Sequence, residues 1–170
     1  MGIEPGTPAR RLVTGHRALK SRVLFDGQLP LIPGFASDAR TVWQHNEYPA
    51  ELASHDAAEG KVQIYTGGSL IRVVDFPPNS QGHNHRTLSL DYAILLQGEL
   101  ELVLEDGSRS IIRPGDIVVQ QATMHQWNNL TDKPCRIVFV LMPSQAPEAN
   151  GKELEDYGFP AQYKPDFRRK

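Results

Sequence analysis

The chain lacks the disulfide bonds that stabilise small secreted proteins and the long hydrophobic segments that anchor proteins in membranes. Cys135 is the only cysteine among 170 residues, so no disulfide can form within the chain. No hydrophobic run approaches the roughly 20 residues that a membrane-spanning helix needs. The first residues also lack the apolar core of a secretory signal. These absences predict a cytoplasmic location and no membrane partner.

An excess of charge of one sign is absent as well. The formal net charge is −2, from 18 Lys and Arg against 20 Asp and Glu. The one basic cluster is Arg168-Arg169-Lys170, which is typical of a solvated tail. A nucleic-acid-binding surface normally needs clustered positive charge, so we expect no nucleic-acid partner.

Short strands separated by turns are predicted from about residue 60 onward. The segment ELELVLE (99–105) alternates cleanly, with leucines on one face and glutamates on the other. Thirteen prolines and fourteen glycines supply turn signals such as Asp106-Gly107, and no amphipathic helix intervenes. Strands are expected at 69–76, 91–97, 99–105, 108–113, 117–120, 124–129 and 135–142. This pattern predicts an antiparallel all-β fold, either a sandwich or a barrel.

Three regions are expected along the chain. Residues 1–60 form an N-terminal arm of strands and loops, with a hairpin about Gly15 and a strand at 39–44. Residues 61–143 form the barrel, and residues 144–170 form a C-terminal tail. The arm packs on the barrel or crosses to a second subunit, so we expect a homodimer.

Two histidines lie one residue apart near the start of the strand region. His83 and His85 would point to the same face of an extended segment, and Asp91 has the same parity. His125 follows a hairpin and one further strand, which is the separation expected of a strand that returns to the same sheet. Imidazoles and a carboxylate suit iron(II), manganese, nickel or zinc. The spacing alone is equally consistent with two loop histidines that are hydrogen-bonded to the backbone.

The wider pattern around these residues resembles the first motif of the cupin superfamily, G-x5-H-x-H-x3/4-E-x6-G. His83 and His85 match its paired histidines. Asp91, six intervening residues and Gly98 match its carboxylate-to-glycine spacing. Five residues rather than three or four separate His85 from Asp91, and aspartate is one methylene shorter than glutamate. These departures favour a carboxylate that is displaced from its usual place.

The second cupin motif, G-x5-P-x-G-x2-H-x3-N, is matched later in the chain. Pro114-Gly115-Asp116 opens it, and His125 with Asn129 supplies the H-x3-N end. The string QQATMH lacks the P-x-G turn and is one residue short before His125, so that loop is expected to be rebuilt. The resemblance covers roughly residues 68–142.

This resemblance implies a cupin-type double-stranded β-helix, a jelly-roll barrel similar to the compact single-domain cupins that tailor natural products. It also implies that a divalent metal ion, of zinc, iron, manganese or nickel, is held near the barrel axis. Carried over to this sequence, the ligands are His83, His85, Asp91 and His125. The three histidines are also the candidate catalytic residues.

A barrel mouth of this kind is a concave apolar pocket, suited to a small-molecule substrate. Trp127 has the parity of His125 and either lines the pocket or fills the core. Arg86, adjacent to a candidate ligand, is placed to hold a carboxylate or an enolate oxygen. The candidate substrate contacts are Arg72, Arg86, Gln121, Met124 and Trp127.

Three functions are consistent with such a site. A divalent metal with open coordination positions acts as a Lewis acid on a carbonyl or activates water or dioxygen. The preferred hypothesis is a metal-dependent lyase or isomerase, such as a dehydratase, decarboxylase or cyclase. Its substrate would be an oxygenated carbonyl metabolite of secondary metabolism. The alternatives are an iron(II)-dependent dioxygenase and a non-catalytic or metal-free small-ligand-binding barrel.

Overall fold

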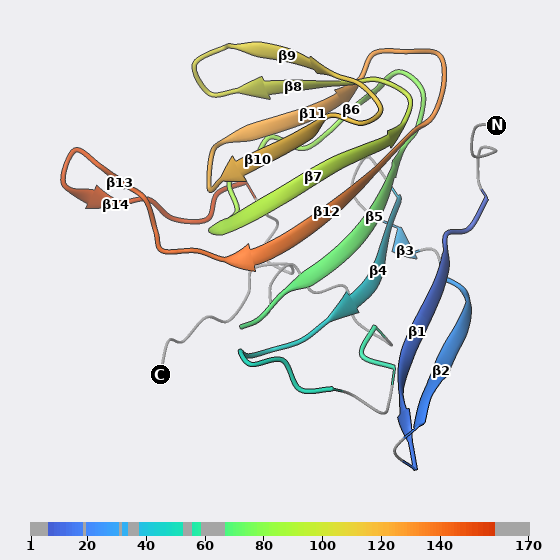
Figure 1. Ribbon diagram of the computed structural model, residues 1–170. Coiled ribbons are helices and arrows are strands. Elements are labelled where there is room, and N and C mark those ends of the chain that lie inside the picture. The colour runs from blue at the N-terminus through green and yellow to red at the C-terminus, as the bar shows by residue number, and fades with distance from the viewer. Residues whose placement is uncertain are drawn as a thin grey trace.

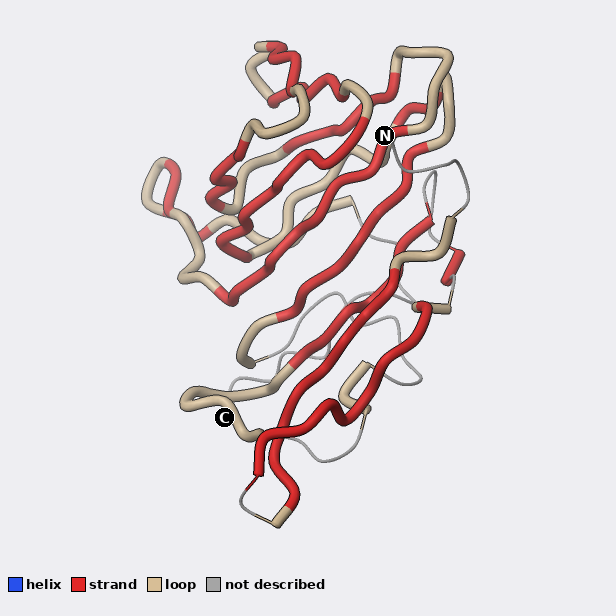
Figure 2. Tube along the Cα trace, turned by 45° about the vertical axis from the view of Figure 1, so that its right-hand side comes forward, coloured by secondary structure: helices blue, strands red, loops and turns tan. Residues whose placement is uncertain are grey.

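Two antiparallel sheets that face each other make up the body of the protein (Figure 1). The computed structural model describes residues 7–18, 20–30, 32–33, 38–52, 56–58 and 67–158. These residues contain strands and loops but no helix (Figure 2), and hence none that could cross a membrane. The expected all-β, jelly-roll class is confirmed.

The larger sheet has six strands in the order β10-β7-β12-β5-β4-β3. Their bounds are β3 Ile32–Pro33, β4 Asp38–Gln44, β5 Leu70–Phe76, β7 Ser89–Gln97, β10 Ile117–Gln121 and β12 Cys135–Pro143. Every neighbouring pair is antiparallel. The strand order shows that consecutive strands of the chain, such as β7 and β8, often lie in different sheets. The larger sheet also contains β4 of the N-terminal region beside β5 of the barrel.

The smaller sheet covers one end of the larger one and has the order β6-β11-β8-β9 (Figure 1). Its strands are β6 Ser80–Gln81, β8 Leu100–Leu104, β9 Arg109–Ile112 and β11 His125–Asn129. Leu100 and Leu102 of β8 are buried in the core, whereas Glu101 between them accepts a 2.9 Å hydrogen bond from Arg109 of β9. The predicted leucine face of this segment is confirmed.

The core lies between the two sheets. Its buried members are Val74, Phe76, Ala93, Leu95, Leu100, Leu102, Ile112, Trp127, Cys135 and Ile137. Trp127 of the smaller sheet meets Phe139 of the larger one edge to face, with ring centroids 5.8 Å apart. Aromatic contact of this kind adds to the burial energy and fixes the distance between the sheets.

The N-terminal arm begins with a hairpin of β1 (Arg10–Arg17) and β2 (Lys20–Gln28). The sequence predicts its turn at Gly15, but Gly15 lies within the ladder, opposite Arg22, and the turn comes after Arg17. Arg11 ties this hairpin to the rest of the chain, because its guanidinium donates to the backbone oxygen of Val42 and pairs with Asp56. The hairpin thus contacts strand β4, which belongs to the larger sheet.

The C-terminal tail returns to the smaller sheet. Residues 148–153 form a small hairpin of β13 (Glu148–Ala149) and β14 (Lys152–Glu153). Beyond it, Tyr157 pairs with Arg86 through two backbone hydrogen bonds of 3.0 and 3.1 Å. The side chain of Asp156 accepts a further bond from the amide of Leu88, at 2.8 Å. The tail therefore adds a bridge beside the segment that carries His85.

Gly98, the motif glycine between β7 and β8, offers a test of this packing. Its φ is +84°, and a Cβ there would lie 2.9 Å from the Cα and Cβ atoms of Cys135. Gly107 has a similar φ of +82° but has no atom within 4 Å of the added Cβ position. Gly107→Ala should cost about 1–2 kcal/mol of backbone strain, and Gly98→Ala should cost clearly more because the clash is added. Urea unfolding measures both losses, and equal losses would contradict the contact with Cys135.

Candidate metal and acid–base site

The two predicted histidines from distant parts of the chain meet inside the barrel. His85 and His125 are directly opposed and exchange two backbone hydrogen bonds of 3.0 Å. Directly opposed residues in an antiparallel pair present their side chains on one side, and the ring centroids lie 4.3 Å apart. His125 has the parity of the core residue Trp127, so this side is the interior.

Backbone carbonyls set the protonation of both rings. Nδ1 of His85 lies 2.9 Å from the oxygen of His83, and Nδ1 of His125 lies 2.9 Å from the oxygen of Thr123. A carbonyl oxygen can only accept, so each Nδ1 carries the proton and each Nε2 carries a lone pair. This tautomer is the one that metal-binding histidines commonly adopt.

Burial keeps the two imidazoles neutral. Burial lowers the pKa of His125 to about 3. The neighbouring His85 ring also lowers this pKa, and its effect is larger than the opposite effect of the hydrogen bond to Thr123. Burial also lowers the pKa of His85. At physiological pH both rings therefore offer lone pairs and no positive charge.

His83 lies beside this pair. Its ring stacks on that of His85, with centroids 5.6 Å apart and planes inclined by 21°. The side chain is half-buried, whereas His125 is buried. The three histidines thus form a row that runs from the interior toward the surface.

Asp91 occupies a separate polar position on the inner face of β7. Its Oδ2 accepts a hydrogen bond from Gln120 Nε2 at 3.0 Å, and the side chain is buried. Burial raises the pKa of Asp91 to about 6, against the opposing effects of Ser89 and Arg72. A buried carboxyl group that titrates near neutrality is suited to proton transfer.

Arg72 supplies a positive charge on this inner face. Arg72 of β5 lies opposite Phe139 of β12, and Phe139 lies opposite Ala93 of β7. Ala93 is two residues from Asp91, so Arg72 and Asp91 are on the same face of the sheet. Burial lowers the pKa of Arg72 to about 10, and the negative charge of Asp91 partly offsets this effect. The guanidinium stays charged at neutral pH and places positive potential inside the barrel.

Of the four predicted ligands, His85 and His125 lie with their ring centroids 4.3 Å apart, and the ligand roles of His83 and Asp91 stay predictions. In the parts of the chain that the structure describes, no three His, Cys, Asp or Glu side chains are grouped so that they could hold one ion. His85 and His125 present two Nε2 lone pairs, which suit a borderline divalent ion. Asp91 is instead hydrogen-bonded to Gln120. Two protein ligands would leave several coordination positions for water or substrate.

The candidate substrate contacts are divided between two faces. Trp127 and Arg72 belong to the inner face, and Arg86 and Met124 line a pocket on the outer face of the smaller sheet. Gln121 is exposed and pairs with Leu90 on the outer side of β7. These roles stay predictions.

Gln120 is an inward-facing residue that was not among the predicted site residues. It pairs directly with Asp91 in the antiparallel register of β10 and β7. If the sequence showed which side chains of β10 face inward, strand alternation would identify Gln120 as one of them. The run Ile117 to Val119 is apolar at every position, however, so its alternation cannot be seen in the sequence.

Asn129, the last residue of the second motif, is a structural residue. It is fully buried, and its side-chain amide donates to the backbone oxygens of Phe76, Pro77 and Lys133 at 2.7–3.2 Å. Its Oδ1 accepts from the amide and hydroxyl of Thr131. The residue therefore closes the turn that leads into β12.

Comparison with known proteins agrees with this fold and motif arrangement. The Cupin domain family matches residues 72–141. The cupin-domain-containing oxidoreductase fogC of Aspergillus ruber is 37% identical over 68% of this chain and 61% of that protein. The cupin-domain-containing oxidoreductase srdB of Neurospora crassa is 30% identical over 88% of this chain and 81% of that protein. The chain belongs to the cupin superfamily.

More limited matches point the same way. Phomopsin biosynthesis cluster protein D of Diaporthe leptostromiformis is 42% identical over 52% of this chain and 47% of that protein. The chain thus spans about half to three fifths of the length of this relative and of the Aspergillus ruber protein. A cupin-2 domain protein of Rhodospirillum rubrum is 10% identical over 96% of this chain and 84% of that chain, with a TM-score of 0.50. That similarity concerns the fold alone.

Proposed function

We propose that this protein is a metal-dependent cupin lyase or isomerase that acts on a small oxygenated carbonyl metabolite of secondary metabolism. The observation that carries the proposal is the separation of two kinds of reactive group. A neutral imidazole pair, His85 and His125, supplies ligands, and Asp91 remains outside that pair with a pKa of about 6. The relative in a phomopsin biosynthesis cluster supports a tailoring role.

The imidazole pair is suited to hold a metal rather than to move protons. A group with a pKa of about 3, as in His125, is a weak base near neutral pH. A divalent metal held by the two Nε2 atoms would supply Lewis acidity toward a carbonyl oxygen. His85 and His125 themselves keep their orientation through their Nδ1 bonds to the backbone.

Asp91 is the group that transfers protons. At pH 7 most of it is ionised and can accept a proton from the carbon next to a carbonyl, and its raised pKa lets it return that proton readily. Gln120 holds one of its oxygens. Arg72 is placed to stabilise negative charge that develops on the substrate.

Metal binding tests the first half of the proposal. We expect purified protein without a polyhistidine tag to bind one equivalent of Co²⁺ or Zn²⁺, measured by elemental analysis after dialysis and by the visible spectrum of Co²⁺. His85→Ala and His125→Ala should each abolish this binding, since either change leaves a single imidazole. His16→Ala is the control, because His16 is an exposed residue of the N-terminal hairpin. Unchanged binding in both site variants would favour a metal-free or ligand-binding barrel.

Oxidation is the second candidate, favoured by the names of two relatives as oxidoreductases. The two reactions differ in their need for dioxygen.

The assay uses protein loaded with Fe²⁺, Mn²⁺ or Zn²⁺ and a panel of β-hydroxy ketones. A lyase converts these substrates to conjugated enones and water, which ultraviolet absorbance monitors, and the rate should be the same with and without air. Asp91→Asn should remove this turnover and keep the bound metal. Turnover that stops without air and consumes dioxygen with Fe²⁺ would identify an iron(II)-dependent dioxygenase.

A further inference from the structure

A pocket of about 380 Å³ lies on the outer face of the smaller sheet. Its lining includes Arg86, Val103, Glu105, Met124, Gln126 and Tyr157. A volume of this size is sufficient for a small organic molecule. The lining combines a cation, a carboxylate, apolar side chains, amides and an aromatic ring, so it offers both polar and apolar contacts to a ligand.

The pocket is separated from the histidines by the sheet itself. Arg86 follows His85 in the chain, and Gln126 follows His125, so strand alternation directs each pair of neighbours to opposite faces. Gln126 pairs with Val103, and Arg86 pairs with Tyr157, in the described register. The same two strand segments thus present histidines inside and pocket residues outside.

Arg86 is the charged group that this pocket leaves poorly satisfied. Its side chain is only 12% exposed, and its ion pair with Glu105 is long, at 3.4 Å. Its Nε is buried without a hydrogen-bond partner among the described residues. A buried guanidinium N–H without an acceptor is costly. Glu105 is 72% exposed, so it can leave the pocket at little cost.

We propose that this outer pocket binds a small organic carboxylate, separately from the interior site. The planar carboxylate fits the Nε and Nη2 edge of Arg86, where two parallel hydrogen bonds can form. It replaces the long contact to Glu105 and satisfies the buried Nε. Met124 and Val103 offer apolar surface, and Tyr157 an aromatic ring, to the rest of the ligand.

Benzoate is the probe for this site, and benzamide is its uncharged control. Titration calorimetry should show benzoate binding to the full chain and much weaker binding of benzamide. Arg86→Met should weaken benzoate binding by about tenfold or more, because a charge-assisted hydrogen bond is lost. Glu105→Gln should strengthen it by about threefold, because a competing exposed carboxylate is removed. Changes of opposite sign would not follow from a merely structural role.

Two further variants locate the binding. Arg109→Met removes an exposed arginine, 63% exposed, that pairs with Glu101 on the same sheet, and it should leave the benzoate affinity unchanged. Asp91→Asn alters the interior site and should also leave it unchanged, so the result is independent of the proposed reaction. Equal affinity for benzamide, no binding, unchanged affinity in Arg86→Met, or loss of binding only in Asp91→Asn would overturn the proposal. Circular dichroism and the unfolding midpoint check that Arg86→Met is folded. If Arg86→Met does not fold, the benzoate affinity of Glu105→Gln still tests the site.

Discussion

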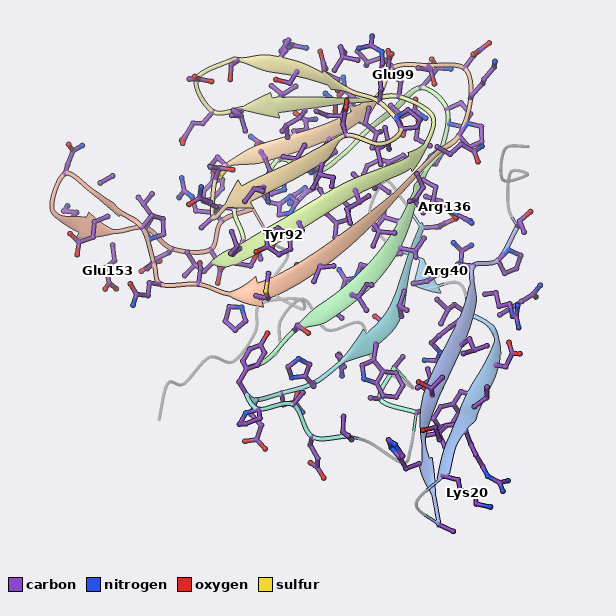
Figure 3. All side chains as sticks on the ribbon, viewed as in Figure 1. Lys20, Arg40, Tyr92, Glu99, Arg136 and Glu153 are labelled. Atoms are coloured by element: carbon purple, nitrogen blue, oxygen red, sulfur yellow. The ribbon has the colours of Figure 1, made fainter. Side chains whose placement is uncertain are left out.

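Asp75→Asn is expected to destabilise the protein by about 3–5 kcal/mol, because it leaves two buried arginines without their shared counter-ion. Asp75 Oδ2 accepts from Arg40 Nη1 at 2.5 Å, and its Oδ1 accepts from Arg136 Nε at 2.5 Å. The side chains of Arg40 and Arg136 are only 4% and 8% exposed. Figure 3 labels both arginines on the side of the larger sheet that faces the β1–β2 hairpin.

This charge cluster also joins four segments of the chain. Arg40 lies on β4, Asp75 on β5 and Arg136 on β12, and Arg136 Nη2 donates to the backbone oxygen of Thr7 at 2.7 Å. Burial disfavours the carboxylate of Asp75, but the hydrogen bonds from Arg136 and Arg40 outweigh it and hold its pKa below the ordinary value. The ionised form is thus the one that the folded protein stabilises.

Urea unfolding at pH 7 measures the loss, and a second ion pair supplies the control. Arg10 and Asp26 form a 2.7 Å pair on the N-terminal hairpin, with side chains 66% and 43% exposed. Asp26→Asn removes the same charge from a similar pair in water, so its effect should be small. If Asp75→Asn were no more damaging than Asp26→Asn, the buried cluster would not exist in solution.

The strands could be predicted because their signals are local. Alternation of leucine and glutamate in 99–105 and turn residues at Asp106-Gly107 depend only on neighbouring positions. Each expected barrel strand occurs within two residues of its predicted ends. The prediction of the hairpin turn at Gly15 is wrong because a glycine is tolerated inside a ladder, and Gly15 lies there opposite Arg22.

The candidate site was only partly predictable because it depends on register between strands. The meeting of His85 and His125 follows from motifs that the sequence shows. The contact of Asp91 with Gln120, and the sharing of Asp75 by two arginines, need the pairing of strands that lie 29 to 61 residues apart. Parity within one strand does not reveal which residue of another strand lies opposite. The outer pocket likewise includes Tyr157, which the tail brings beside Arg86.

The titration of Asp91 should make the wild-type protein less stable at neutral than at acid pH, relative to Asp91→Asn. Its pKa is about 6 when folded and 3.8 in the reference state, so between these values the folded chain binds more protons than the unfolded chain. Stability therefore falls as pH rises from about 4 to about 6 and is level above that range. At 1.36 kcal/mol per pH unit, the full difference is about 3 kcal/mol.

Unfolding free energies of the two proteins, measured in urea from pH 4 to pH 7.5, test this difference. His85 and His125, whose pKa values burial lowers, act in the opposite direction, because the unfolded chain binds their protons more readily and stability therefore falls as pH falls. Both proteins contain them, so their effect cancels in the comparison. Asp26→Asn is a control in which the pH dependence of the difference from wild type has the opposite sign. The hydrogen bond from Arg10 lowers the pKa of Asp26, so its carboxylate stabilises the fold as pH rises.

Parallel profiles for wild type and Asp91→Asn would mean that the carboxyl group titrates normally. It would then have no special fitness for proton transfer, and the proposed role of Asp91 would be lost with it. A gap that opens between pH 4 and pH 6 would instead show that the fold maintains this acid at a cost in stability. Such a cost is expected at a position that serves a reaction rather than the fold, because neutral side chains of similar size would pack there without it.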